Sequence, residues 1–253
     1  MPKVLYEIKT QHHQVKVVEE NSIRKLLFGE GLSKEQSGID INNLYLHVFD
    51  YSLLSMHSLL FSTTPSSILV IGLGGGVIPR EISRFVPESN IDIIEIDEEV
   101  YKIAKEYFYF EDSEKVNVHI GDAFSIVKTL SKKYDIIIAD AFCGGYIPFH
   151  LMSDNFIKSL YSIMNEKSVI AFNMCNWHMS FFSQLNTVCS VFGYDNIYQL
   201  RGRRNKYTSI IFASKGNLSP ADSFNVSSQS FPTLEPLKYQ ISMAVRNSKI
   251  FHV

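Results

Sequence analysis

The sequence predicts an α/β protein with a Rossmann-like, doubly wound sheet that is mostly parallel and has an antiparallel edge. Between residues 67 and 191, short runs rich in Val and Ile alternate with stretches whose apolar residues recur at helical spacing. A glycine-rich turn at 72–76 joins the first run to a helix, and acidic residues end the second run. This order of strand, turn, helix and strand is typical of nucleotide-binding domains.

The first 47 residues are β-rich. Branched and alternating residues predict three strands, at 4–8, 14–19 and 24–28. So short a segment cannot bury a core of its own. We therefore expect a small N-terminal β-hairpin domain over residues 1–47, packed on a main domain of residues 48–253 or on a second subunit.

A helix is expected from Leu44 to Met56, where apolar residues lie three and four positions apart. Strands and helices then alternate, which implies a parallel sheet with right-handed crossovers. The expected strands are 68–72, 91–96, 116–119, 135–139 and 168–173. The expected helices are 77–86, 98–108, 123–132, 153–165 and 177–191. Two late strands, 195–200 and 207–213, are separated by a short turn and predict the antiparallel edge.

The glycine turn favours one kind of nucleotide. Gly72, Gly74 and Gly76 are spaced Gly-x-Gly-x-Gly, and Val77 occupies the place of the third glycine of the dinucleotide fingerprint. No Walker lysine follows, so an NTP-binding loop is excluded. The pattern fits S-adenosylmethionine binding better. Glu95, at the end of the second strand, suits a bidentate contact with the ribose hydroxyls.

Two more acids follow later strands, at the sheet edge where open α/β proteins bind ligands. Asp122 is suited to accept a hydrogen bond from an adenine amino group. Asp140 ends the strand 135–139 and is suited to orient or deprotonate a nucleophile. The alternative is that Asp140 only caps a turn.

Bulk composition excludes several classes of protein. The 253 residues are 45% hydrophobic and carry a formal net charge of −2, with no basic cluster typical of nucleic-acid binding. The three cysteines show no disulfide or zinc spacing, the histidines show no ligand spacing, and no apolar run is long enough to span a membrane. We therefore expect a cytoplasmic protein with no metal and with neither nucleic-acid nor membrane partners.

The chain resembles the spermidine synthase (polyamine aminopropyltransferase) family, in a divergent bacterial branch. The resemblance covers Gln36 to about Asn173 and rests on four motifs that occur in the family's order. They are Leu69-Val-Ile-Gly-Leu-Gly-Gly-Gly with Arg80-Glu81, Ile94-Glu-Ile-Asp-Glu-Glu-Val100, Ile120-Gly-Asp-Ala-Phe124 and Tyr134-Asp-Ile-Ile-Ile-Ala-Asp140. It implies a methyltransferase-type catalytic domain, an N-terminal β domain, and a homodimer or homotetramer.

The resemblance also implies roles for individual residues. Asp140 falls on the family's catalytic aspartate, and Tyr45 falls on a tyrosine beside the acceptor channel, although its spacing alone would make it a core residue of a helix. Cys143 and Tyr146 fall in the loop beside the substrate, with Cys143 as a pocket-lining thiol or a nucleophile. The residues implied at the donor are Gln36, Gly72, Gly74, Gly75, Gly76, Glu95, Asp122 and Ala123.

Two positions depart from the family pattern. Gly75 and Cys143 stand where polyamine synthases carry aspartates that bind the amines of donor and acceptor. A diamine is a dication at neutral pH, so its burial requires compensating carboxylates. The loss of both weakens the expectation of an ordinary diamine acceptor.

Three functions therefore stay open. The first is aminopropyl transfer from decarboxylated S-adenosylmethionine to an amine, with release of methylthioadenosine. The second is transfer of a methyl or aminocarboxypropyl group from S-adenosylmethionine itself, which the missing carboxylate at Gly75 would favour. The third is a non-catalytic homologue that binds a nucleoside.

Overall fold

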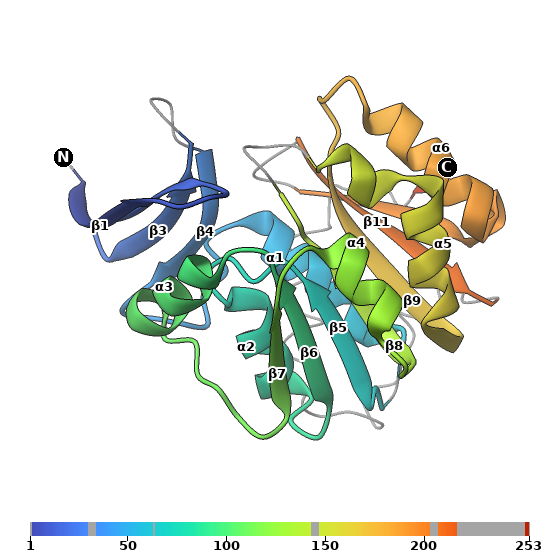
Figure 1. Ribbon diagram of the computed structural model, residues 1–253, viewed down its shortest axis with the longest axis horizontal. Coiled ribbons are helices and arrows are strands. Elements are labelled where there is room, and N and C mark those ends of the chain that lie inside the picture. Colours follow the sequence, from blue (N-terminus) through green and yellow to red (C-terminus); the bar gives the residue numbers. More distant parts are fainter. Residues whose placement is uncertain are drawn as a thin grey trace.

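The protein is described here by a computed structural model that covers residues 2–29, 34–62, 64–142, 147–202, 207–216 and 251–252. These residues form two sheets with helices around the larger one (Figure 1). The smaller sheet precedes the larger one in the chain and lies beside helix α3, Glu98–Phe108. The α/β class with a β-rich N-terminal part is thus confirmed.

The larger sheet has the strand order β12-β10-β11-β9-β8-β5-β6-β7. The five strands from β9 to β7 are parallel, and β11 pairs antiparallel with both β9 and β10. The strands are β5 (Ser67–Ile71), β6 (Asn90–Glu95), β7 (Val116–Ile120), β8 (Tyr134–Ala139), β9 (Met164–Cys175), β10 (Ile197–Arg201), β11 (Thr208–Lys215) and β12 (Phe251–His252). The predicted antiparallel edge is confirmed, and the order reverses direction between β5 and β8.

Helices cover both faces of this sheet. One core layer packs α1 and α2 against it, and the other packs α5 and α6 against the opposite face. The helices are α1 (Asp50–Ser55), α2 (Val77–Phe85), α3, α4 (Ala123–Ile126), α5 (Asp154–Ser162) and α6 (Phe181–Phe192). Short 3₁₀ helices are Met56–Leu60, Val127–Thr129, Phe149–Met152 and Tyr194–Asn196.

Three expected helices have different bounds. The helix expected at 123–132 is one α turn and one 3₁₀ turn that end at Thr129, because Leu130 is extended. The helix expected at 177–191 begins only at Phe181. The helix expected at 153–165 ends at Ser162, since β9 begins four residues earlier than predicted.

The helix expected from Leu44 to Met56 has the wrong start, because α1 begins at Asp50. An isolated bridge joins Asp40 to Asn43, and the side-chain oxygen of Asn43 accepts a hydrogen bond from the Tyr45 amide at 3.2 Å. Asn side chains that bond to nearby backbone compete with helix formation in this way. The chain therefore turns at 40–46 before α1 starts.

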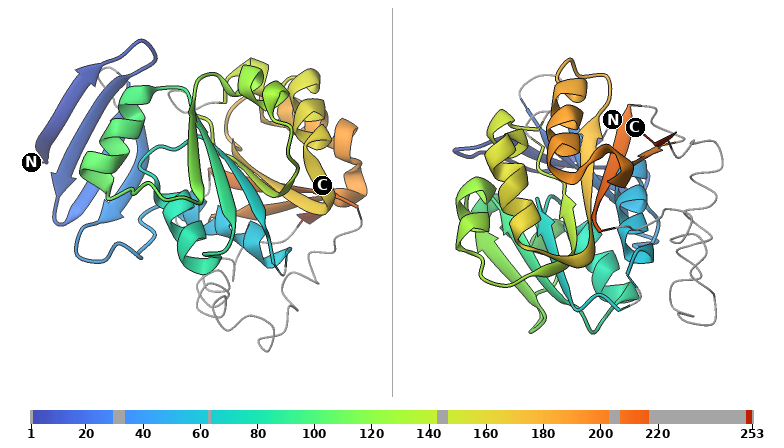
Figure 2. Two further views of the ribbon diagram at one scale, coloured as in Figure 1. Left: turned by 60° about the horizontal axis from the view of Figure 1, so that its bottom comes forward. Right: turned by 90° about the vertical axis from the view of Figure 1, so that its right-hand side faces the viewer.

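The N-terminal sheet is antiparallel in the order β1 (Lys3–Lys9), β2 (Gln14–Glu20), β3 (Ile23–Phe28) and β4 (Lys34–Asp40). The fourth strand was not predicted, because Ser37-Gly38 interrupts its alternation. Gly38 lies against an aromatic ring, since a Cβ there would meet Phe49 at 2.9 Å. Figure 2 shows this sheet beside α3 in a second view.

The N-terminal sheet is anchored on α3 by apolar and polar contacts. Its buried side chains share a core cluster with three residues of that helix. Around the cluster, the Tyr6 hydroxyl donates to Glu99 at 2.8 Å and Arg24 donates to the Tyr107 carbonyl at 2.7 Å. Thr10 donates to Asp97, the N-cap residue of α3. The sheet is therefore held over the carboxyl ends of the larger sheet.

The switch point between β5 and β8 depends on Gly72. Its φ is +95°, and a Cβ at this position would lie 2.3 Å from the carbonyl oxygen of Asp140. The Gly72 amide donates to Ile94 at 2.8 Å, and the Asp140 amide donates to Ile71 at 2.8 Å. Only glycine lets these strand ends approach so closely.

We expect Gly72→Ala to lower the free energy of unfolding by at least ~3 kcal/mol, since it adds a backbone clash to a strained φ that costs roughly 1–3 kcal/mol. Gly193→Ala is the matched control, because Gly193 also has a positive φ, of +81°, but a Cβ there meets nothing closer than 3.6 Å. Urea unfolding of both variants measures the difference. Equal losses of unfolding free energy in the two variants would show that the contact with Asp140 adds nothing to the cost of a side chain at position 72.

Candidate active site

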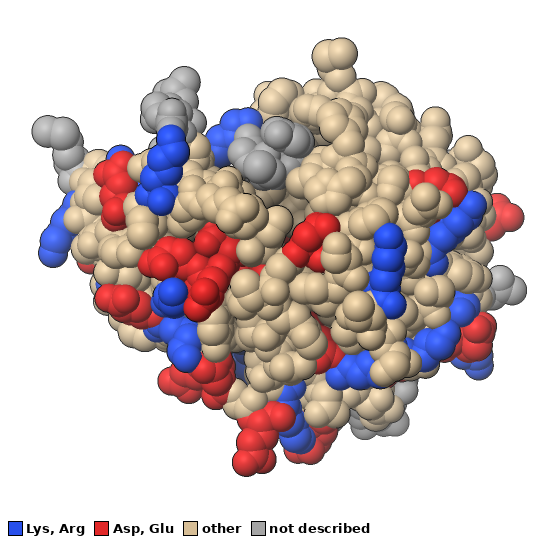
Figure 3. Space-filling model, viewed as in Figure 1, with Lys and Arg blue, Asp and Glu red and all other residues tan. Residues whose placement is uncertain are grey.

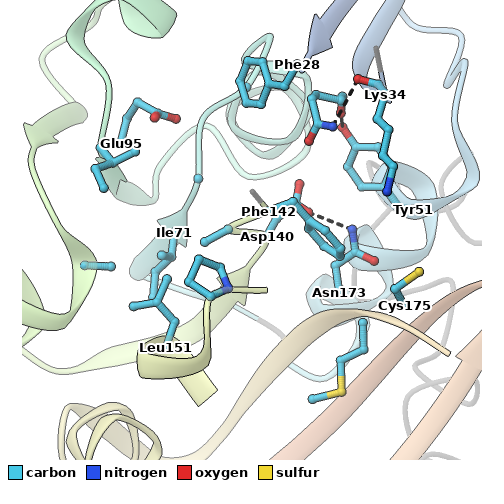
Figure 4. Close-up of a pocket in the computed structure, with 18 of the residues that line it drawn as sticks. Phe28, Lys34, Tyr51, Ile71, Glu95, Asp140, Phe142, Leu151, Asn173 and Cys175 are labelled. Carbon is cyan, nitrogen blue, oxygen red and sulfur yellow. Dashed lines mark hydrogen bonds between the residues drawn. The ribbon is translucent and has the colours of Figure 1, made fainter. Parts of the chain in front are cut away.

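A pocket of about 430 Å³ opens where the carboxyl ends of the central parallel strands meet the N-terminal sheet. Its lining includes residues that follow β5, β6, β7, β8 and β9, together with the turn 12–13 and the start of β4. It thus lies at the topological switch point, where open α/β sheets bind ligands. Figure 4 shows the side chains that converge on it.

Glu95 lies at the end of β6, buried, with both carboxylate oxygens held by backbone amides. One oxygen accepts from Leu73 at 2.9 Å and the other from Asp97 at 3.0 Å. Burial raises the pKa of Glu95, and these N–H groups oppose that rise by favouring the charged form. The glycine turn therefore fixes the orientation of a carboxylate that lines the pocket.

Asp122 and Ala123 line another part of the pocket, where α4 begins. Asp122 is the N-cap of α4 and accepts from the Phe124 amide at 3.3 Å. The His150 ring nitrogen lies 3.1 Å from the same carboxylate oxygen. Sequence reasoning did not single out His150, which comes from a different segment.

Asp140 follows β8 and faces the middle of the pocket. Its carboxylate accepts a hydrogen bond of 2.7 Å from the Asn173 amide on β9, drawn as a dashed line in Figure 4. Some of its surface is accessible from the pocket, whereas protein surrounds its other sides. The pKa of Asp140 is raised to about 7, mainly by burial and also by the charge of Glu95, while the Asn173 hydrogen bond opposes the rise.

The tyrosine beside Asp140 is Tyr51, not the predicted Tyr45. The Tyr51 hydroxyl donates to the Gln36 carbonyl at 2.8 Å, and the charge of Asp140 contributes to a raised pKa of Tyr51 that burial mainly causes. Tyr45 does not line this pocket: it is 57% exposed, and Arg84 stacks on its ring at 4.6 Å. Tyr45 lies in the turn at 40–46, whereas Tyr51 lies in the first turn of α1.

Only part of the glycine loop lines the pocket. Gly72 and Gly74 line the pocket, whereas Gly75 and Gly76 do not. A Cβ at Gly75 would lie 2.8 Å from the Ser37 hydroxyl and 2.9 Å from the Phe108 ring. Position 75 therefore has no room for an aspartate unless these neighbours move.

Cys143 and Tyr146 lie outside the described residues.

Several pocket residues were missed by sequence reasoning because they come from distant segments. They are His12, His13, Phe28, Lys34, Tyr51, Asn173, Cys175 and Trp177. His13 stacks on Phe28 at 4.1 Å between ring centroids. The residues of the N-terminal sheet could have been indicated only by the placement of that sheet over the strand ends, whereas Asn173 and Cys175 lie at the end of β9.

The part of the chain that the structure describes holds no cluster of three or more His, Cys, Asp or Glu side chains suited to a metal ion. Within the same ranges, no helix is long and apolar enough to cross a membrane. On the face shown in Figure 3, lysines and arginines are interspersed with acids, and acids gather near α3. That face carries no broad basic patch of the kind that binds nucleic acid.

Comparison with known sequences identifies the family. The Spermine/spermidine synthase domain family matches residues 48–218, which is more than half of the chain. The chain belongs to the spermine/spermidine synthase family. The resemblance inferred from the four motifs is therefore confirmed.

Two relatives in this family are named polyamine aminopropyltransferase. The protein of Vibrio vulnificus is 35% identical over 198 residues, which cover 75% of this chain and 65% of that protein. The protein of Saccharolobus solfataricus is 33% identical over 178 residues, which cover 66% of this chain and 56% of that protein. The chain thus spans between about half and two thirds of the length of these relatives.

Solved structures with the same fold include spermidine synthases and a methyltransferase. A probable spermidine synthase from Corynebacterium glutamicum has a TM-score of 0.76 at 13% identity and covers 97% of this chain and 89% of its own. A spermidine synthase in complex with the transition-state analogue AdoDATO has a TM-score of 0.67 at 19% identity, with 87% and 76% coverage. Human methyltransferase-like protein 13 in complex with SAH has a TM-score of 0.64 at 22% identity, with 76% and 93% coverage. At these identities the likeness concerns the fold.

The raised pKa of Asp140 predicts a pH-dependent contribution to stability. Folding raises this pKa from 3.8 to about 7, so the contribution is complete below pH 4 and is lost as pH rises through 7. The loss is at most about 4 kcal/mol, because each pH unit between the two values corresponds to about 1.4 kcal/mol. Asp140→Asn, which cannot ionise, should therefore gain stability relative to the wild type between pH 4.5 and pH 8.

Urea unfolding at both pH values measures this difference. Glu98→Gln is the control, since Glu98 is exposed on α3 and does not line the pocket. If the difference in unfolding free energy between the wild type and Asp140→Asn does not change with pH, the raised pKa of Asp140 is contradicted.

Proposed function

We propose that the chain is an aminopropyltransferase, which moves the aminopropyl group of decarboxylated S-adenosylmethionine to an amine and releases methylthioadenosine. The observation that carries this proposal is the Asp140 carboxylate, held by Asn173 at the middle of the pocket with a pKa near 7. Membership of the spermine/spermidine synthase family supports it.

The donor would extend along the strand ends from β7 towards β8. Adenine would lie at Asp122 and Ala123, and the ribose hydroxyls would donate to Glu95, whose oxygens each keep a lone pair beside their amide bonds. Gly72 and Gly74 would let the sulfonium and its chain pass close to the backbone. The transferred carbon would then face Asp140.

A decarboxylated donor fits this path better than S-adenosylmethionine itself. The donor's chain would pass between Glu95 and Asp140, whose charges already interact unfavourably. A carboxylate on that chain would add a third negative charge, whereas the amine of the decarboxylated donor adds a positive one. The neighbours of Gly75 leave no space there for a family-type aspartate, so Glu95 and Asp140 would balance the charge of that amine in addition to their contacts with the ribose and the acceptor.

Asp140 would remove the proton that blocks attack. A primary amine is protonated in neutral water, and its nitrogen can attack only after losing that proton. A carboxylate with a pKa near 7 is ionised in about half of the molecules at pH 7 and is suited to accept it. The carbon–nitrogen bond then forms as the carbon–sulfur bond breaks, and the sulfonium electrons return to sulfur as neutral methylthioadenosine.

Transfer of a methyl group remains the second candidate, because a methyltransferase in complex with SAH has the same fold. A displacement at the methyl carbon also needs a positioned nucleophile. The donor preference separates the two candidates: release of methylthioadenosine indicates aminopropyl transfer, and release of S-adenosylhomocysteine indicates methyl transfer. A homologue that only binds a nucleoside would release neither.

We expect Asp140→Asn to lower kcat by about 100-fold or more, the range of a lost general base. Its affinity for methylthioadenosine should change less than about 3-fold, because the ribose contacts remain. Glu95→Gln should weaken methylthioadenosine binding by about 10- to 100-fold, the equivalent of charged hydrogen bonds of about 1.5–3 kcal/mol. Calorimetry and an assay of methylthioadenosine release measure both effects.

Glu98→Gln serves as the matched control outside the pocket. Its kcat and its affinity for methylthioadenosine should equal those of the wild type. Undiminished turnover in Asp140→Asn would remove this carboxylate from the reaction. Undiminished nucleoside affinity in Glu95→Gln would mean that the ribose binds elsewhere.

A further inference from the structure

We propose that the acceptor is a primary amine whose far end carries an anionic group, rather than a diamine. This inference rests on the proposed aminopropyl transfer and names the substrate class for the same pocket. The feature that carries it is the Lys34 ammonium, which lies in the half of the pocket beyond Asp140, away from the donor (Figure 4).

Lys34 begins β4 and reaches over the end of β9. Its backbone carbonyl accepts from the Gln36 side chain at 3.2 Å, and its ammonium lies 5.6 Å from the centre of the Trp177 ring. Its charge also acts on the Cys175 thiol, where it opposes the rise in pKa that burial causes. The position over Trp177 and the effect on Cys175 both place the Lys34 charge at this end of the pocket.

The pocket acids already have partners within the protein or roles in the proposed complex. Those at the ends of β6, β7 and β8 are assigned to the ribose, the adenine and the reacting amine. Glu35 pairs with Lys25 at 2.5 Å. Asp50 is buried at the start of α1 and already has an interaction of its own. Among the described lining residues, no further carboxylate faces this half.

The walls between Asp140 and Lys34 suit a short hydrocarbon chain. They are built from uncharged side chains, which include Tyr51, Phe142, Met174, Cys175 and Trp177. An acceptor with its amine at Asp140 would lie along these walls and end at the Lys34 ammonium. A carboxylate at that end gains an opposite charge, whereas a second ammonium meets a like charge.

The chemistry is the same displacement with a different acceptor. The amine nitrogen forms a bond to the aminopropyl carbon, the carbon–sulfur bond breaks, and methylthioadenosine leaves with the electron pair. The amine's proton goes to Asp140. The anionic far end takes no part in the reaction and only positions the chain.

Three probes of similar length test the inference. They are 4-aminobutyrate, butylamine and 1,4-diaminobutane, whose far ends are negative, neutral and positive. With decarboxylated S-adenosylmethionine as donor, we expect kcat/KM for methylthioadenosine release to fall in that order, by about 10-fold at each step. The products are identified by mass, since each acceptor gains one aminopropyl group.

Variants at Lys34 assign the preference to its charge. Lys34→Met should bring the three amines to within about 3-fold of one another, and Lys34→Glu should reverse the order. Lys3→Glu makes the same charge change on the exposed strand β1, outside the pocket, and should keep the wild-type order. Affinity for methylthioadenosine should be unchanged in all three variants, which confirms that they fold.

The outcomes separate this inference from the proposed function. A wild-type preference for 1,4-diaminobutane would overturn the inference and leave aminopropyl transfer standing. Donor binding without transfer to any of the three amines would also overturn it. A Lys34→Glu variant that loses affinity for intact S-adenosylmethionine but keeps the order of amines would assign Lys34 to a donor carboxylate instead. If the wild type neither binds the decarboxylated donor nor releases methylthioadenosine, the proposed function itself fails.

Discussion

The close approach of two strand ends at Gly72 is the constraint on which the site depends. Because residue 72 has no side chain, the backbone of Asp140 can lie against it, and β5 and β8 end at the same level. The loop that leaves β5 then supplies the amides that hold Glu95, and the loop that leaves β8 starts with the Asp140 carboxylate. One contact thus sets the relative positions of the proposed ribose and reaction sites.

The second half of the pocket depends on the N-terminal sheet. This sheet contributes little core of its own and is held by α3, through Thr10 at Asp97 and Tyr6 at Glu99. Asp97 lies just beyond the end of β6, the strand that carries Glu95 at the donor site. The same stretch of chain therefore positions both the donor carboxylate and the sheet that brings Lys34 to the acceptor end.

Features that depend on local sequence were predictable, whereas features that depend on how two sheets meet were not. The strands around Gly72 and Asp140 follow from Val/Ile runs and strand ends, and their bounds were right within one or two residues. The tyrosine beside Asp140 was misassigned, because family spacing pointed to Tyr45 and the turn after Asp40 was not recognised. Tyr51 and Lys34 face the pocket only because of tertiary packing, which leaves no periodic pattern in the sequence.

The most direct test of this account is a crystal structure of the protein with bound methylthioadenosine. We expect both ribose hydroxyls to contact Glu95, adenine to lie at Asp122, and the sulfur to face Asp140 with open space towards Lys34. A nucleoside in the reversed direction, with adenine towards Lys34, would contradict it. A nucleoside bound away from the switch point would contradict it as well.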